Sequence, residues 1–257
     1  MCGRYASSRK PEDLAEEFEI DRARAAESVP EPLAPDYNVA PTKSVYAVLT
    51  RPDGPRDLRV LTWGLVPFWA KDPKIGSRMI NARTETVAEK PAYRQAFAKR
   101  RCLLPADGYY EWYPTSQVGR SGKPLKQPFF IRPKDGSSLA MAGLYEIWRD
   151  KDKADDDPTR FLWTCTVLTT EAEDEVGVIH DRMPMLVERD RWADWLDPER
   201  TATDDLTGLL VPAAPGRLEA YPVSTAVNAV RNNGPELVEP LPLDDVPDGV
   251  PDVPAAP

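Results

Sequence analysis

Residues 101–113 read RCLLPADGYYEWY and predict two β-strands, 101–105 and 109–113, rich in apolar and aromatic side chains. Similar β-rich or apolar runs predict further strands at 45–50, 58–63, 129–133, 139–145, 161–169 and 218–223. Helical patterns are found at 11–28, 86–100 and 189–196. Many short strands with few helices predict an α+β domain built on one curved, barrel-like, mainly antiparallel sheet flanked by helices.

No internal repeat and no interdomain linker interrupts this pattern before the last residues. We therefore expect one domain over residues 1–240. Residues 241–257 are rich in Pro, Asp and Ala, and no Lys or Arg follows Arg231. This acidic tail is predicted to be disordered, because it has too little apolar surface to bury.

The composition excludes several classes of protein. The chain has 257 residues, 41% of them hydrophobic, and no apolar run approaches the roughly 18 residues of a membrane span. Its first residues lack the apolar core of a signal peptide, so a cytoplasmic location is expected, with nucleoid association when DNA is bound. Three cysteines and one histidine, none at metal-ligand spacing, predict no disulfide framework, no metal and no cofactor.

Charge is unevenly distributed along the chain. The net charge of −9 opposes binding to nucleic acid, yet residues 71–101 hold nine basic and three acidic side chains. This basic segment is either a nucleic-acid contact or a solvated helix face, and the pattern alone leaves both open.

Cys2 is the residue with the most unusual chemistry. Once Met1 is removed, it carries an α-amine, with a pKa of about 7.7–8.0, and a thiol on the same carbon. The amine can form a Schiff base with an aldehyde, and the thiol can then close a five-membered thiazolidine ring on the same carbon. The alternative is that position 2 holds cysteine by chance.

Two titratable residues are candidates for proton transfer. His180, the single histidine, lies in a polar loop, His180-Asp181-Arg182, that suits a site better than a core. Glu111 lies among aromatic residues that would desolvate its carboxyl and raise its pKa. A structural hydrogen-bonding role for His180 and an outward-facing position for Glu111 remain as alternatives.

Two further segments suit a polar, base-bearing ligand. Asn81 and Arg83 are two residues apart in extended chain and so face the same side, where they could contact a phosphate. Phe68 and Trp69 follow a glycine in a predicted loop, and exposed aromatics beside arginines stack on unpaired bases. Core packing is the alternative for these aromatics, and is favoured for Trp63.

Taken together, these segments resemble the SRAP family (SOS response-associated peptidase), whose members sense abasic sites. The resemblance runs from residue 2 to about residue 240 and includes a block that must stand at the N-terminus. The blocks that carry it, in family order, are 1–5 MCGRY, 37–42 YNVAPT, 63–67 WGLVP, 80–85 INARTE, 102–112 CLLPADGYYEW, 126–131 KQPFFI, 180–184 HDRMP and 221–224 YPVS with Val227-Asn228.

The resemblance implies an enzyme that crosslinks covalently to abasic sites in single-stranded DNA and so protects them. It implies that Cys2 is the nucleophile, and that the active site is completed by Asn81, Glu111 and His180. The residues implied to hold phosphates are Arg4, Arg83 and Arg182. The residues implied to pack on bases or to line the site are Pro41, Phe68, Trp69 and Thr169.

Two other functions remain open at this point. Cys2 could be the nucleophile of a thiol peptidase, with His180 as base and self-removal of Met1 as its peptide cleavage. A reversible, non-catalytic binder of single-stranded DNA is the third possibility. The expected partner is single-stranded DNA with abasic sites, no membrane is involved, and a monomer is expected.

Overall fold

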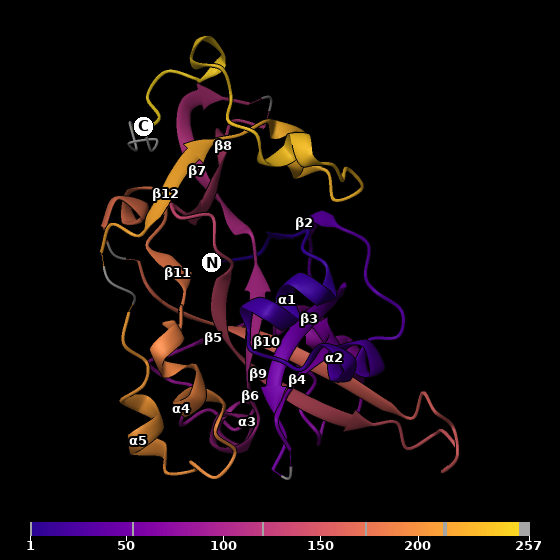
Figure 1. Ribbon diagram of the computed structural model, residues 1–257. Helices are drawn as coiled ribbons and strands as arrows, with labels where there is room; N and C mark the ends of the chain where they lie inside the picture. Colours follow the sequence, from indigo (N-terminus) through magenta and orange to yellow (C-terminus); the bar gives the residue numbers. More distant parts are fainter. Residues whose placement is uncertain (1, 53, 120, 173, 213–214, 252–257) are drawn as a thin grey trace.

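The centre of the computed structural model is a closed β-barrel (Figure 1). The structure describes residues 2–52, 54–119, 121–172, 174–212 and 215–251. Its five barrel strands follow the ring order β10-β4-β3-β6-β9, and β9 pairs again with β10 to close it. Only the β10–β4 pairing in this ring is parallel. The bounds are Ser44–Thr50 for β3, Arg56–Trp63 for β4, Arg101–Ala106 for β6, Leu139–Arg149 for β9 and Phe161–Glu171 for β10.

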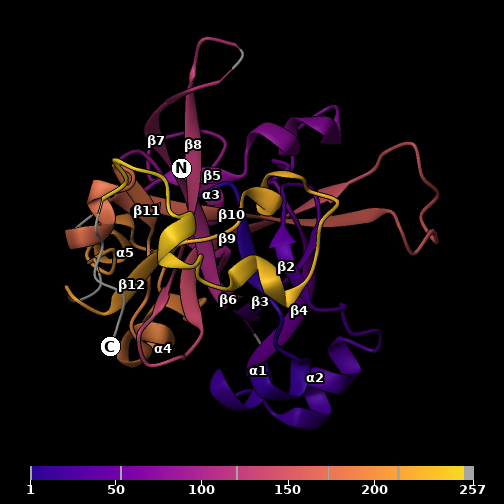
Figure 2. The same ribbon diagram turned by 90° about the horizontal axis from the view of Figure 1, so that it is seen from above.

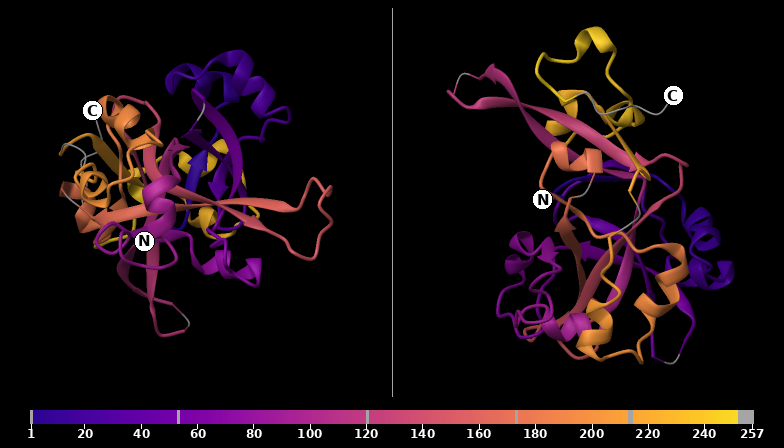
Figure 3. Two further views of the ribbon diagram at one scale, coloured as in Figure 1. Left: turned by 90° about the horizontal axis from the view of Figure 1, so that it is seen from below. Right: turned by 90° about the vertical axis from the view of Figure 1, so that its left-hand side faces the viewer.

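Two short strands extend the barrel at β10. Asn81–Arg83 (β5) pairs with it in parallel, and Arg182–Pro184 (β11) pairs antiparallel. Beyond the barrel, β9 and β10 continue as a hairpin that projects from the body, as the views in Figures 2 and 3 agree.

A second, antiparallel sheet lies against the barrel in the order β12-β8-β7-β1-β2. Its strands are Tyr5–Ser7 (β1), Asp36–Val39 (β2), Gly108–Val118 (β7), Pro124–Pro133 (β8) and Leu218–Pro222 (β12). The sequence did not predict this division into two sheets, although the expected fold class, α+β with a barrel-like and mainly antiparallel sheet, is confirmed.

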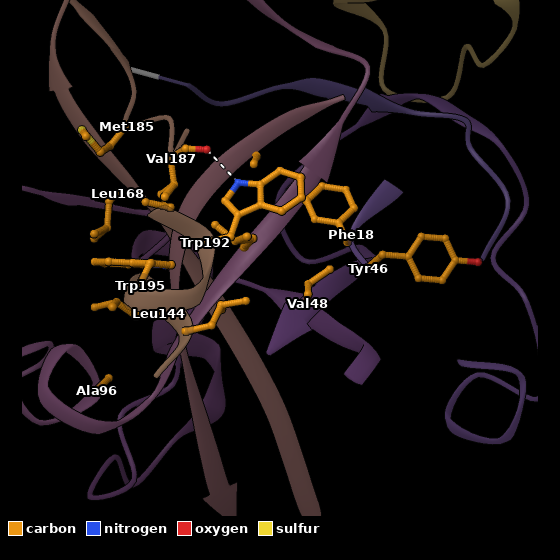
Figure 4. Packing of buried hydrophobic residues seen from close by; sticks show 14 of the residues in the cluster. Phe18, Tyr46, Val48, Ala96, Leu144, Leu168, Met185, Val187, Trp192 and Trp195 are labelled. Atoms are coloured by element: carbon orange, nitrogen blue, oxygen red, sulfur yellow. Dashed lines mark hydrogen bonds between the residues drawn. The ribbon is translucent and has the colours of Figure 1, made fainter. Parts of the chain in front are cut away.

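Short helices cover the outside of the barrel. A cluster of buried apolar side chains lies between these helices and the barrel strands. The helix bounds are Pro11–Glu17 (α1), Arg22–Ser28 (α2), Arg94–Lys99 (α3), Trp192–Leu196 (α4) and Thr203–Thr207 (α5). Phe18 stacks on Trp192 with ring centroids 4.6 Å apart, and the indole donates a 2.8 Å hydrogen bond to the Val187 carbonyl (Figure 4). None of the helices in the described part of the chain has the length and apolar character to cross a membrane.

Two helix predictions were wrong in extent. The predicted helix 11–28 is two helices, because Glu19 between them has a φ of 59° and cannot continue an α-helix. The predicted helix 86–100 is helical only at α3, and Pro91, which lacks an amide hydrogen and restricts the residue before it, explains why the preceding turns do not join it.

The C-terminal residues follow the second sheet instead of the barrel. Val223 forms a β-bridge with Pro240, and the Leu241 amide donates to the Pro222 carbonyl at 2.9 Å. The chain then makes a 3₁₀ turn at Leu243–Asp245 and passes Ser116 at Gly249. Residues 252–257 of the predicted tail lie outside the described residues.

Arg101, the first residue of β6, connects that strand to the ends of two helices. It is 4% exposed, and its guanidinium donates only to backbone carbonyls at the ends of α3 and α4. The acceptors are the carbonyls of Phe97, Ala98, Trp195, Asp197 and Arg200. Burial lowers the pKa of the guanidinium to about 10.

Replacing Arg101 by methionine is expected to lower the free energy of unfolding by about 3 kcal/mol, because several buried carbonyls lose their donor at once. Urea unfolding measures this, with Arg94→Met on the exposed face of α3 as a control expected to change stability by less than about 0.5 kcal/mol. Equal losses in the two variants would contradict the assigned role.

Candidate active site

Cys2 lies just before β1, where the second sheet meets the barrel. Its side chain is fully buried in a cluster that includes Tyr5, Trp63 and Tyr109. The Asn81 side-chain amide donates a 2.7 Å hydrogen bond to the Cys2 carbonyl. Asn81 is the first residue of β5, so the strand that pairs with β10 also fixes the backbone of the candidate nucleophile.

Glu111 is buried next to the same cysteine. It is 3% exposed on β7, the strand that pairs with β1. Burial raises the pKa of its carboxyl, and the nearby His180 opposes that rise. Burial and the negative charge of Glu111 also raise the pKa of the Cys2 thiol. Burial therefore favours the neutral form of both groups, and a Glu111 carboxyl that has lost its proton is a stronger base than an exposed carboxylate.

His180 completes the group from the loop between the 3₁₀ helix 174–178 and β11. Its Nε2 lies 4.0 Å from Glu111 Oε2. Its Nδ1 lies 3.0 Å from the Arg182 backbone nitrogen and 2.9 Å from Asp181 Oδ1. The imidazole thus lies between the buried carboxyl of Glu111 and the exposed carboxylate of Asp181.

His180 also lines a surface depression with charges of both signs. The residues that line it are Arg83, Glu171, Ala172, Gly177, His180, Asp181 and Arg182. Of the predicted phosphate ligands, Arg83 is exposed here and Arg182 is largely buried. An anionic strand lying across this depression would pass within reach of both arginines and of the imidazole.

Arg182 already has protein partners. It forms a bidentate ion pair with Glu85, and Nη2 donates to the Thr169 carbonyl at 2.6 Å. Thr169 is itself buried, on β10 where it pairs with Pro184 and Arg83. In this structure Arg182 and Thr169 hold β5, β10 and β11 together beside the site.

Arg4 and Pro41 lie at the ends of strands of the second sheet, Arg4 directly before β1 and Pro41 shortly after β2. The Arg4 guanidinium donates to Asn38 Oδ1 at 2.6 Å and to the Val227 carbonyl at 2.9 Å, and it lies 5.9 Å from the Trp112 ring. Pro41 follows β2 and is partly exposed. Arg4 therefore anchors the C-terminal segment, and only part of its surface is available to a ligand.

Phe68 and Trp69 are exposed, by 49% and 52%. Trp63, by contrast, is buried, as its sequence context favoured. Their loop crosses the backbone at Gly76: a Cβ at Gly64, whose φ is 131°, would lie 2.5 Å from the Gly76 carbonyl oxygen. Only glycines allow this close crossing at the start of the segment that carries the two aromatic side chains.

Comparison with known proteins identifies the family of this chain. The family model of the SOS response associated peptidase (SRAP) matches residues 1–230. The chain belongs to the SRAP family. It is 40% identical over 240 residues to the abasic site processing protein YoaM of Bacillus subtilis, covering 93% of this chain and 98% of that protein.

A more distant relative and a solved structure also cover almost all of the chain. It is 32% identical over 244 residues to the abasic site processing protein YedK of Escherichia coli, covering 94% of this chain and 100% of that protein. A crystal structure of a Bacteroides thetaiotaomicron protein has the same fold, with a TM-score of 0.76, 24% identity and coverage of 93% of this chain and 100% of that one.

Within this SRAP chain, the sequence missed three residues that shape the site. Glu85 forms an ion pair with Arg182, and Asp181 lies beside the imidazole. Asn38 accepts a hydrogen bond from Arg4, and its side-chain amide donates to three backbone carbonyls of the C-terminal segment. All three lie inside quoted family blocks, yet nothing in their spacing indicated a partner. Among the described residues, no group of His, Cys, Asp and Glu side chains is placed to bind a metal ion.

Proposed function

We propose that this protein processes abasic sites in single-stranded DNA by forming a covalent crosslink through Cys2. The observation that carries the proposal is the grouping at the N-terminus: Asn81 holds the Cys2 backbone, the buried Glu111 acts on the Cys2 thiol, and the partly exposed His180 lies 4.0 Å from Glu111. The names of the SRAP relatives, abasic site processing proteins, supply the substrate class.

The first step uses the α-amine of Cys2, which becomes available when Met1 is removed; Met1 lies outside the described residues. The amine attacks the aldehyde carbon of the ring-opened deoxyribose and gives a carbinolamine. His180 Nε2 gives a proton to the carbinolamine hydroxyl, which leaves as water while the nitrogen lone pair forms an iminium. An imidazole suits this transfer, because its ordinary pKa is close to neutral pH.

The second step uses the thiol. Its raised pKa keeps it protonated at neutral pH, so the amine reacts first. When sulfur bonds to the iminium carbon, the thiol proton passes to the Glu111 carboxylate and the iminium electron pair returns to nitrogen. The product is a thiazolidine, which has no C=N bond and therefore cannot undergo the strand-breaking elimination of a Schiff base.

DNA binding is assigned to residues that line the depression and to exposed residues elsewhere on the surface. Arg83 contacts phosphate, and Phe68, Trp69 and Pro41 pack on bases, contacts that need no sequence recognition. Arg182 reaches a phosphate only if it gives up its ion pair with Glu85. Arg4 and Thr169 stabilise the structure around the site through their hydrogen bonds. An abasic nucleotide is favoured because no base has to be unstacked to enter the site.

The test is a denaturing gel of the purified protein with abasic and intact single-stranded oligonucleotides of one sequence. An adduct that survives denaturation is expected with the abasic strand alone. Mass analysis is expected to show it on a chain that has lost Met1, with one water lost per crosslink. Equal retention of both strands, or an adduct on protein that keeps Met1, would refute the proposal.

A further inference from the structure

One nitrogen of His180 faces two groups that cannot both bind it. Nδ1 lies 3.0 Å from the Arg182 backbone N–H, which donates and so needs the Nδ1 lone pair. The same atom lies 2.9 Å from Asp181 Oδ1, a carboxylate that needs a proton on Nδ1. An imidazole nitrogen has a single in-plane position, filled by a lone pair or by a proton. The two contacts therefore belong to two states of the ring.

The two states differ in what Nε2 can do. With the Arg182 amide bound, the neutral ring carries its proton on Nε2 and can only donate a hydrogen bond from it. With Asp181 bound, Nδ1 carries a proton, so Nε2 can accept a proton as a base, or release one as an acid from the doubly protonated ring. Nε2 is the atom that faces Glu111, at 4.0 Å.

We infer that Asp181 is a positioning residue that selects the acid–base-competent state of His180 against the Arg182 backbone amide. The inference deepens the proposed function and rests on it for the rate. After His180 gives its Nε2 proton to the departing hydroxyl, the remaining Nδ1–H stays bonded to Asp181, and the ring is neutral and ready to be protonated again.

The other charged side chains described around the imidazole are Glu111, Arg83, Glu171 and Arg182, and they do not replace Asp181 at Nδ1. Glu111 approaches from β7 on the Nε2 side. Arg83, Glu171 and the Arg182 side chain line the depression, and the Arg182 guanidinium is paired with Glu85. Asp181 is 87% exposed, so solvent screens its charge and the effect of removing it is moderate.

The chain has one histidine, so the experiment has a clean readout. Protein labelled with ¹⁵N-histidine gives one pair of imidazole nitrogen signals, which report directly where the ring proton lies. In Asp181→Ala the neutral ring is expected to shift toward the Nε2–H form. Asp181→Asn, which keeps an uncharged acceptor, is expected to lie between that variant and the wild type.

Crosslinking rates provide the second readout. At saturating abasic oligonucleotide, Asp181→Ala is expected to react roughly two- to five-fold more slowly, the range that corresponds to an exposed ion pair. Asp190→Ala, which removes another exposed carboxylate, is the matched control and is expected to leave both readouts unchanged.

An unchanged tautomer in Asp181→Ala, or the same change in Asp190→Ala, would overturn the inference. If the tautomer shifts but the rate does not, Asp181 orients the ring without serving the reaction, which also overturns it. If the wild-type protein forms no adduct at all, the proposed function fails, and that outcome is separate because the nitrogen signals are read without DNA.

Discussion

Replacing Cys2 by alanine is expected to abolish the denaturation-resistant adduct with abasic DNA. The variant keeps an α-amine but loses the sulfur that closes the thiazolidine, so any product is a Schiff base that hydrolyses on denaturation. The gel assay with single-stranded abasic oligonucleotide measures the loss. Reversible binding to DNA is expected to remain, because the assigned phosphate and base contacts come from other residues.

Cys2→Ser separates the two nucleophiles. Serine also keeps the amine, so borohydride is expected to trap a Schiff base that is otherwise labile. Cys165→Ala is the matched control, since that thiol is equally buried in the barrel but faces the Thr62 carbonyl instead of the catalytic group. A stable adduct in Cys2→Ala, or its loss in a folded Cys165→Ala protein, would contradict the mechanism.

Replacing Glu111 by glutamine is expected to slow crosslinking by roughly 10² to 10⁴, the range for loss of a positioned acid–base group. Glutamine keeps the shape but cannot accept the thiol proton. Single-turnover rates with saturating oligonucleotide measure the change. Intact mass of the variant also tests the peptidase alternative: retained Met1 would indicate self-cleavage through this site, and lost Met1 would make it unnecessary.

The sign of the pH effect follows from burial. Burial raises the pKa of Glu111 in the folded protein. The wild-type crosslinking rate should therefore rise with pH above the range of an ordinary glutamate, near 4.3, and Glu111→Gln should lack this rise.

The raised pKa of Glu111 also destabilises the folded protein at neutral pH, because the glutamate ionises more readily in the unfolded chain. Glu111→Gln should therefore match or exceed the wild type in thermal stability, and a clear loss would argue for a structural role.

The long strands were predictable because their apolar or aromatic runs of five or more residues leave a clear pattern. Three strands beside the site show no such pattern: β1, β5 and β11 have three residues each, too few to show a period, although residues 81–83 were expected to be extended. They form because β7 and β10 offer them pairing edges, a long-range contact that no local pattern encodes.

The candidate site was predictable in part. The chemistry of Cys2 follows from its position, and the aromatic surroundings of Glu111 indicated its burial and raised pKa. The pairing of Arg182 with Glu85 and of His180 with Asp181 could not be foreseen, because each depends on which way a side chain turns at the end of a short strand.

The contact between Gly64 and Gly76 has a consequence for binding thermodynamics. The two backbones touch where a methyl group would not fit, so glycine at positions 64 and 76 fixes where the segment carrying Phe68 and Trp69 begins. Under the proposed function, any part of that segment that is already in place when a strand arrives reduces the conformational freedom lost on binding, so more of the stacking free energy is kept. Every base has an aromatic face, so this contribution to binding would not depend on sequence.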